Sequence, residues 1–226
     1  MFGIFKKNKT KKHTKKNEAE HTESEELGEP VWHELGEGNP FDHPILDIRS
    51  ITLNLVATTT EKWIAENYVA SRSDDGKQYI DQHIPGSKKI DSNLRYPHNG
   101  EQLEGIVSKA ESMDEKWDIY AYGNWFYFVR SWTSELVYKA HYQNTGSELV
   151  LDYIMSSDES NASLQEQNIH SIILTYVLGR VWPYHIPEHM QNEGGKAIAM
   201  YLFSMFGCKA TLATSANVLN IKLKEK

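Results

Sequence analysis

The stretch that decides the fold is Lys116–Tyr142, KWDIYAYGNWFYFVRSWTSELVYKAHY. Aromatic and β-branched residues dominate it, and such side chains fit a pleated, half-buried surface better than a helix. The dipeptide Gly123-Asn124 separates two runs of this kind. A two-residue loop that begins with glycine has the twist of a tight hairpin turn. The stretch therefore predicts a β-hairpin closed at this loop.

Alternation of side chains along the hairpin predicts two faces. With this loop, Tyr122 lies opposite Trp125, and Trp117 lies opposite Arg130, within reach of a cation–π contact. We expect one face to be the core face, and it carries Ile119, Ala121, Phe126 and Phe128. The other, which we name the tyrosine face, carries Tyr120, Tyr122, Trp125 and Tyr127, with Asp118 near one end.

A third strand, residues 135–142, can join the hairpin in two registers. A two-residue loop, Thr133-Ser134, would place Lys139 on the core face, where an unpaired charge costs roughly several kcal/mol. A three-residue loop, residues 132–134, moves Lys139 and His141 to the tyrosine face and brings Leu136, Tyr138 and Ala140 to the core face. We therefore predict the longer loop, followed by a fourth strand over residues 148–154.

Patterns elsewhere predict the remaining elements. Alternating Ile51, Leu53 and Leu55 indicate a strand, and a helix is expected over residues 59–72 with an apolar face of Trp63, Ile64, Tyr68 and Val69. Further elements are a strand over 88–95, helices over 169–177 and 196–206, and an edge strand over 210–214. The predicted fold class is α+β, an antiparallel sheet with a central aromatic β-meander, one helix from the N-terminal half and two C-terminal helices packed on the sheet.

Charge divides the chain into two parts. Residues 1–38 are predicted to be a disordered charged tail, and residues 39–226 a single α+β domain. Seven lysines lie in residues 1–16; without them, 17 basic side chains remain against 31 acidic ones, a net charge of −14. An acidic body argues against nucleic acid as a partner. Apolar side chains beside the lysines leave open a weak contact of residues 1–16 with a membrane surface.

Several classes of site are disfavoured by the sequence. The single cysteine, Cys208, excludes an internal disulfide and follows a helix end, where the dipole does not stabilise a thiolate, so we expect it to be structural. The chain has no G-x-S-x-G, P-loop or G-x-G-x-x-G pattern. No stretch approaches the roughly 18 apolar residues of a membrane span, which predicts a cytoplasmic protein.

One metal-like motif is His185-Ile186-Pro187-Glu188-His189, which matches the H-x-x-E-H spacing of some zinc enzymes. Pro187 would interrupt the helix that must align the two imidazoles. The sequence therefore predicts no metal and no cofactor, and a polar surface loop at this position.

A binding surface is the favoured site. Tyr and Trp rings offer large contact area with polar tips, so the predicted binding residues are Tyr120, Tyr122, Trp125, Tyr127 and His141, together with Trp182 and His185 of the later loop. The alternative is that the two C-terminal helices cover this face. We expect a non-enzymatic binding or regulatory protein with a protein partner. A hydrolase or transferase built from dispersed residues such as Asp42, His43, Asp47 and Arg49 is the competing hypothesis, and the sequence assigns neither catalytic residues nor an oligomeric state.

Overall fold

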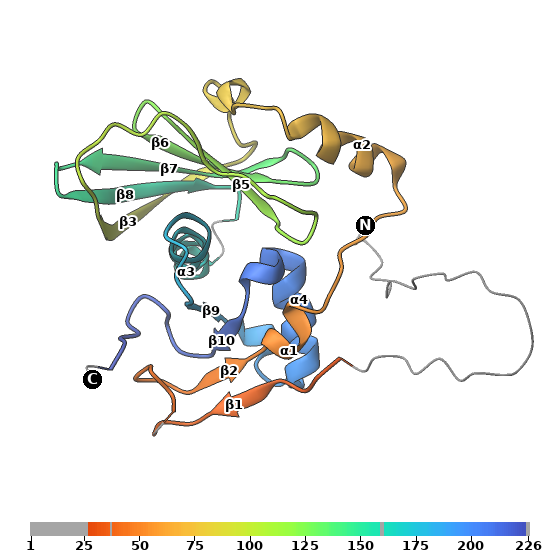
Figure 1. The fold of residues 1–226 in the computed structure, drawn as a ribbon. Coiled ribbons are helices and arrows are strands. Elements are labelled where there is room, and N and C mark those ends of the chain that lie inside the picture. The colour runs from red at the N-terminus through yellow and green to blue at the C-terminus, as the bar shows by residue number, and fades with distance from the viewer. Residues whose placement is uncertain (1–26, 37, 159–160, 225–226) are drawn as a thin grey trace, which may run out of the picture.

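The structure, a computed structural model, describes residues 27–36, 38–158 and 161–224. These residues form two β-sheets and four α-helices, and α3 (Ala162–Ile172) lies between the sheets (Figure 1). The larger sheet contains the aromatic meander at its centre. The predicted α+β class is therefore confirmed.

The large sheet is antiparallel, with strands in the order β3-β8-β7-β6-β5-β4. Its strands are β3 (Lys88–Pro97), β4 (Gly105–Ser108), β5 (Trp117–Tyr122), β6 (Trp125–Arg130), β7 (Leu136–Asn144) and β8 (Glu148–Ser156). All but β4 were expected. Gly123 and Asn124 have φ angles of 54° and 66°, as a tight hairpin loop of this twist requires.

The register of β5 and β6 agrees pair by pair with the prediction. Tyr122 lies opposite Trp125 and Trp117 opposite Arg130, whose guanidinium carbon is 4.8 Å from the centre of the Trp117 ring. Within the described residues, the side chains of the core face are buried. The turn and the alternation of side chains together fixed this part of the fold.

β7 follows the predicted register along most of its length and departs from it at its start. His141 lies opposite Trp125, and Tyr138 lies opposite Phe128. The register then shifts, so that Leu136 lies opposite Val129 and packs on the tyrosine face. The prediction of a core position for Leu136 is wrong, because a β-bulge places one extra residue in β7.

Two C-terminal helices pack against the large sheet, as predicted. α3 continues into a wider π turn, Ile173–Val177, and its Ile169 and Ile172 belong to the hydrophobic cluster that includes Phe126 and Phe128 of the core face. α4 (Gly195–Phe206) ends at β5, where Trp117 Nε1 donates to the Met205 carbonyl at 3.1 Å. One contiguous core thus reaches from the large sheet to the small one.

The small sheet was not predicted. Its strands are β1 (Val31–His33), β2 (Ile45–Asp47), β9 (Pro183–His185) and β10 (Leu212–Thr214), in the order β1-β2-β10-β9, with β9 and β10 parallel. β10 corresponds to the strand expected over residues 210–214, although it lies inside the sheet and not at its edge. The strand expected at 51–55 is wrong, since α1 (Arg49–Thr52) ends at the second residue of that range and residues 53–55 lie in no strand.

β1 lies within the segment predicted to be disordered, so ordered structure starts earlier than residue 39. Residues 1–26 and 37 of that segment lie outside the described residues.

α2 (Lys62–Ser71) confirms the helix predicted over residues 59–72 but not its apolar face. The side chains of Trp63 and Val69 are exposed. Polar contacts attach this helix to the large sheet, among them the Asn67 side-chain amide, which donates to the Trp132 carbonyl at 2.7 Å.

Candidate functional site

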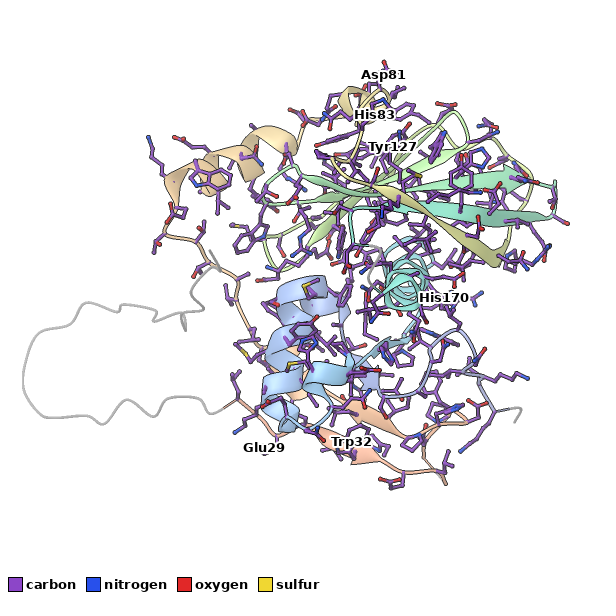
Figure 2. All side chains as sticks on the ribbon, turned by 180° about the vertical axis from the view of Figure 1, so that it is seen from behind. Glu29, Trp32, Asp81, His83, Tyr127 and His170 are labelled. Atoms are coloured by element: carbon purple, nitrogen blue, oxygen red, sulfur yellow. The ribbon has the colours of Figure 1, made fainter. Side chains whose placement is uncertain are left out.

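The tyrosine face of the large sheet is half covered by residues 74–87, which we name the cover segment. It includes the short helix η1 (Lys77–Tyr79), and Figure 2 shows Asp81 and His83 above Tyr127. The Tyr79 ring stacks on Tyr120 with centroids 5.6 Å apart. Tyr120 and Tyr127 are each 1 % exposed and Tyr122 is 9 % exposed. These three rings, which were predicted to be binding residues, are therefore buried, and the element that covers them is this segment and not the C-terminal helices.

The cover segment provides hydrogen-bond acceptors for the hydroxyls of two of the rings that it buries. The Tyr122 hydroxyl donates to the Asp75 carbonyl at 2.7 Å, and the Tyr127 hydroxyl donates to the Ile80 carbonyl at 3.4 Å. Gly76, with φ of 87°, lies directly against the Tyr120 ring, where a side chain would not fit. The Tyr120 hydroxyl instead accepts from Lys109 Nζ. Buried hydroxyls need such partners, so the backbone of the cover segment accounts for the polar tips of Tyr122 and Tyr127.

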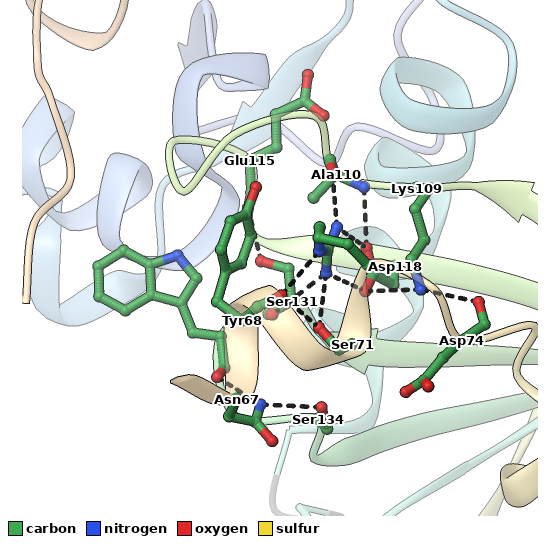
Figure 3. A network of polar contacts seen from close by, with 12 residues as sticks. Asn67, Tyr68, Ser71, Asp74, Lys109, Ala110, Glu115, Asp118, Ser131 and Ser134 are labelled. Atoms are coloured by element: carbon green, nitrogen blue, oxygen red, sulfur yellow. Dashed lines mark hydrogen bonds and ion pairs between the residues drawn. The ribbon is translucent and has the colours of Figure 1, made fainter. Parts of the chain in front are cut away.

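A buried charged network holds the start of the cover segment to β5 (Figure 3). The Asp118 carboxylate is 2 % exposed; Arg72 Nη2 lies 2.7 Å from its Oδ2, and Lys109 Nζ lies 3.6 Å away. The backbone N–H of Ala110 donates to the same carboxylate at 2.8 Å. Burial lowers the pKa of Lys109 in spite of the neighbouring carboxylate. Two cations around one carboxylate make this a structural network that joins α2, the cover segment and the meander.

Beyond the cover segment, the same face is partly exposed. Three rings from β6, β7 and β8 meet there: Trp125, His141 and Tyr153, which we name the open cluster. His141 stacks on Tyr153 with centroids 5.1 Å apart and an interplanar angle of 12°. Trp125 meets both rings edge-on, at 5.1 Å from His141 and 5.4 Å from Tyr153. The open cluster is therefore a fixed aromatic surface.

A histidine–aspartate pair orients the middle ring of the open cluster. His141 Nδ1 lies 2.7 Å from Asp152 Oδ1, and Gln143 donates to the other carboxylate oxygen at 3.2 Å. Burial works to raise the pKa of Asp152, but the hydrogen bonds from His141 and Gln143 outweigh it, so this pKa lies below its ordinary value. Asp152 remains charged at neutral pH and holds the imidazole in one orientation.

Two lysines lie over the rings. Lys139 Nζ is 4.9 Å from the Trp125 ring centre and 5.1 Å from that of Tyr127, and it donates to the Gln82 carbonyl at 3.3 Å. Burial lowers the pKa of Lys139. Lys89 Nζ is 4.6 Å from the Tyr153 ring centre. Lys89 is also paired with Asp91, at 2.9 Å, so Lys139 supplies the partly desolvated positive charge at this aromatic surface.

Within the described residues, the polar partner of His141 is Asp152 and its ring contacts are Trp125 and Tyr153. No hydroxyl or thiol nucleophile is hydrogen-bonded to this imidazole in that part of the chain, although such a pair is the usual activated arrangement.

The other predicted binding residues lie elsewhere. His185 is on β9, where its Nδ1 lies 3.0 Å from the Ala216 carbonyl oxygen. Trp182 packs edge-on against Phe41 and His170, and its buried Nε1 has no hydrogen-bond partner among the described residues. Of the seven predicted residues, the structure brings only Trp125 and His141 together in the open cluster. Sequence reasoning missed Tyr153, because a bulge in β8 beside Asp152 changes the register that would have placed it.

The metal-like motif is not helical. His185 ends β9, and Pro187 precedes the short helix η3 (Glu188–Met190), so the two imidazoles are not aligned one turn apart. In the described residues, no group of three or more His, Cys, Asp or Glu side chains is placed to hold a metal ion. Searching the same residues for a helix long and apolar enough to cross a membrane finds none.

Comparison of the chain with protein-family models, with curated proteins and with solved structures finds no match in any of the three.

Proposed function

We propose that this is a non-enzymatic cytoplasmic binding protein that engages another protein through the open cluster. The observation that carries the proposal is the division of the tyrosine face. One half is buried by the chain's own cover segment, and the other half, which has the same aromatic character, stays partly exposed. Rigid aromatic side chains give large contact area for little loss of conformational entropy, and they dominate the energetics of many interfaces.

The charge of Lys139 at the open cluster favours an acidic group in the partner. Among the described side chains, no carboxylate lies within ion-pair distance of Lys139, whose amine is partly desolvated over two rings. A partner carboxylate would give it a charge-assisted hydrogen bond. The acidic body as a whole favours a basic partner by long-range attraction, but contacts at the site itself decide specificity. We therefore propose a partner segment that presents an apolar side chain to Trp125 and a carboxylate to Lys139.

Quantitative affinity capture from the native cytoplasm, read by mass spectrometry, tests the proposal. Trp125→Ala removes the largest ring of the site, which is partly buried, and Lys139→Gln removes the charge of that lysine while keeping most of its length. Truncation of a central interface tryptophan commonly costs about 2 kcal/mol or more, which is roughly a 30-fold loss of affinity. The matched control is Trp63→Ala, which removes an equally large but exposed ring from α2.

A supporting result is a protein that the wild type and Trp63→Ala capture and that both site variants lose. Capture of the same proteins by wild type and Trp125→Ala would contradict the proposal. Urea unfolding of each variant shows whether a loss of capture has its origin in a loss of folding.

A further inference from the structure

A pocket lies on the small sheet, on the face that carries Ile45, Asp47 and Leu212. Its volume is about 300 Å³, at the small end of the range for ligand pockets. The walls are apolar and include Phe41, Ile45, Leu212 and Leu223. At one end the lining changes to His33, Asp47 and Arg49.

The fold builds this pocket from both ends of the described chain. Pairing of β2 with β1 and β10 places Asp47 beside Leu212, and His33 opposite Ile45, on one face of the sheet. The C-terminal segment then crosses that face and forms a β-bridge between Leu223 and Phe41. The pocket is thus held on two sides by paired backbone, so it is preformed.

The polar end of the pocket has an unused donor. Arg49 Nε lies 2.9 Å and 3.0 Å from the two Asp47 oxygens, and Nη2 also pairs with Oδ2. Within the part of the chain that the structure describes, the other terminal nitrogen, Nη1, has no hydrogen-bond partner. His33 Nε2 lies 3.9 Å from Asp47 Oδ2.

These charges discriminate between head groups. The Asp47 charge is already balanced by Arg49, so an amine ligand would have to displace the guanidinium from both carboxylate oxygens. An anionic head group would leave that pair intact and would accept from Arg49 Nη1 and from His33. Arg–carboxylate contacts are among the stronger charge-assisted hydrogen bonds in proteins. We propose that the pocket binds a small monocarboxylic acid, with its apolar body against Phe41 and Leu212 and its carboxylate at Arg49 and His33.

Octanoate is the probe, and 1-octanol and octylamine are its matched neutral and cationic analogues. Titrations of the full-length protein are followed by isothermal calorimetry and by NMR shifts of the Ile45 and Leu212 methyl groups. Octanoate should bind with a dissociation constant of about 1 mM or lower and should shift these methyl signals, and both analogues should bind at least about 10-fold more weakly.

Arg49→Gln should weaken the binding of octanoate about 10-fold or more, because it removes the hydrogen-bond donor and leaves Asp47 to repel the anion. The control Arg95→Gln removes a similarly exposed arginine that is paired with Glu148 on the large sheet, and it should leave binding unchanged. Leu223→Asn replaces a largely exposed residue of the pocket wall and should weaken the binding of octanoate and of octanol to a similar extent. This variant gives a second readout if Arg49→Gln folds poorly.

Tighter binding of octylamine or octanol than of octanoate would overturn the assignment of the head group. Absence of saturable octanoate binding up to about 10 mM, or methyl shifts confined to other parts of the protein, would overturn the site itself.

Discussion

The contact between Gly76 and Tyr120 allows a direct test of how the tyrosine face is closed. Gly76→Ala introduces a Cβ that would lie 2.8 Å from Tyr120 Cε1 and closer still to two other ring atoms. The ring has no room to retreat, because it is 1 % exposed and stacked on Tyr79. We expect the substitution to detach the cover segment from the face.

The expected loss of stability in Gly76→Ala has two parts. A positive φ of 87° costs a residue with a side chain about 1–2 kcal/mol relative to glycine. Insertion of a methyl group into a well-packed contact costs about 1–3 kcal/mol more. The free energy of unfolding should therefore fall by about 3 kcal/mol, a large fraction of the 5–15 kcal/mol typical of a folded protein.

A glycine of the same segment provides the control. Gly86 also has a positive φ, 69°, but nothing lies within 4 Å of a Cβ at that position. Gly86→Ala should show the backbone cost without the clash, about 1–2 kcal/mol. The change in the unfolded chain is the same for both substitutions, so the difference of about 2 kcal/mol reports on the contact with Tyr120.

Urea unfolding measures these two losses, and hydrogen exchange locates them. In Gly76→Ala, amides of the cover segment should exchange faster, and the protein should bind a hydrophobic dye at the uncovered rings. Equal losses of stability in the two variants, with unchanged exchange of residues 77–85, would refute the packing of the cover segment on Tyr120.

Three further variants test the buried titratable groups. Asp118→Asn removes the carboxylate between two cations, and urea unfolding should show a loss of about 2–4 kcal/mol. The control Asp75→Asn breaks an exposed pair with Lys77 and should lose much less stability, and equal losses would contradict the network. Burial lowers the pKa of Lys116 to about 7 from 10.5, so the unfolded state holds more protons between these values. Stability should therefore rise above pH 7 by up to about 1.4 kcal/mol per pH unit, and Lys116→Met should remove that rise. Burial lowers the pKa of His170 to about 4 from 6.5, so stability should fall as the pH drops through this range. His170→Asn, which keeps a hydrogen-bond acceptor, should flatten part of that fall, and an unchanged pH profile in either variant would contradict these assignments.

The meander could be predicted because its turn and its strand pairing depend on residues that are close together in the sequence. The Gly123-Asn124 turn and the alternation of rings fix the register of β5 and β6, and the cost of burying Lys139 selects the register of most of β7. Leu136 was misplaced because a β-bulge leaves no mark in the pattern of apolar residues. The same limit applies to Tyr153, which joins the open cluster beyond a second bulge.

The rest of the fold depends on contacts that are distant in sequence. The strands of the small sheet are three residues each, too short for a periodic pattern, and they come from both ends of the described chain. The cover segment has no regular apolar period, and its contact with Tyr120 joins residues about 40 positions apart. Rings with polar tips suit both an exposed binding face and a buried one, so composition alone did not distinguish Tyr120 from Trp125.

Side-chain footprinting by oxidation, read by mass spectrometry, tests the central claim most directly. In the free protein, Trp125 and Tyr153 should be labelled and Tyr120 and Tyr127 should be protected by the cover segment. Addition of the captured partner should protect Trp125 and leave the label on Trp63 unchanged. Protection of Trp125 in the free protein, or labelling of Trp125 that the partner does not alter, would contradict the account.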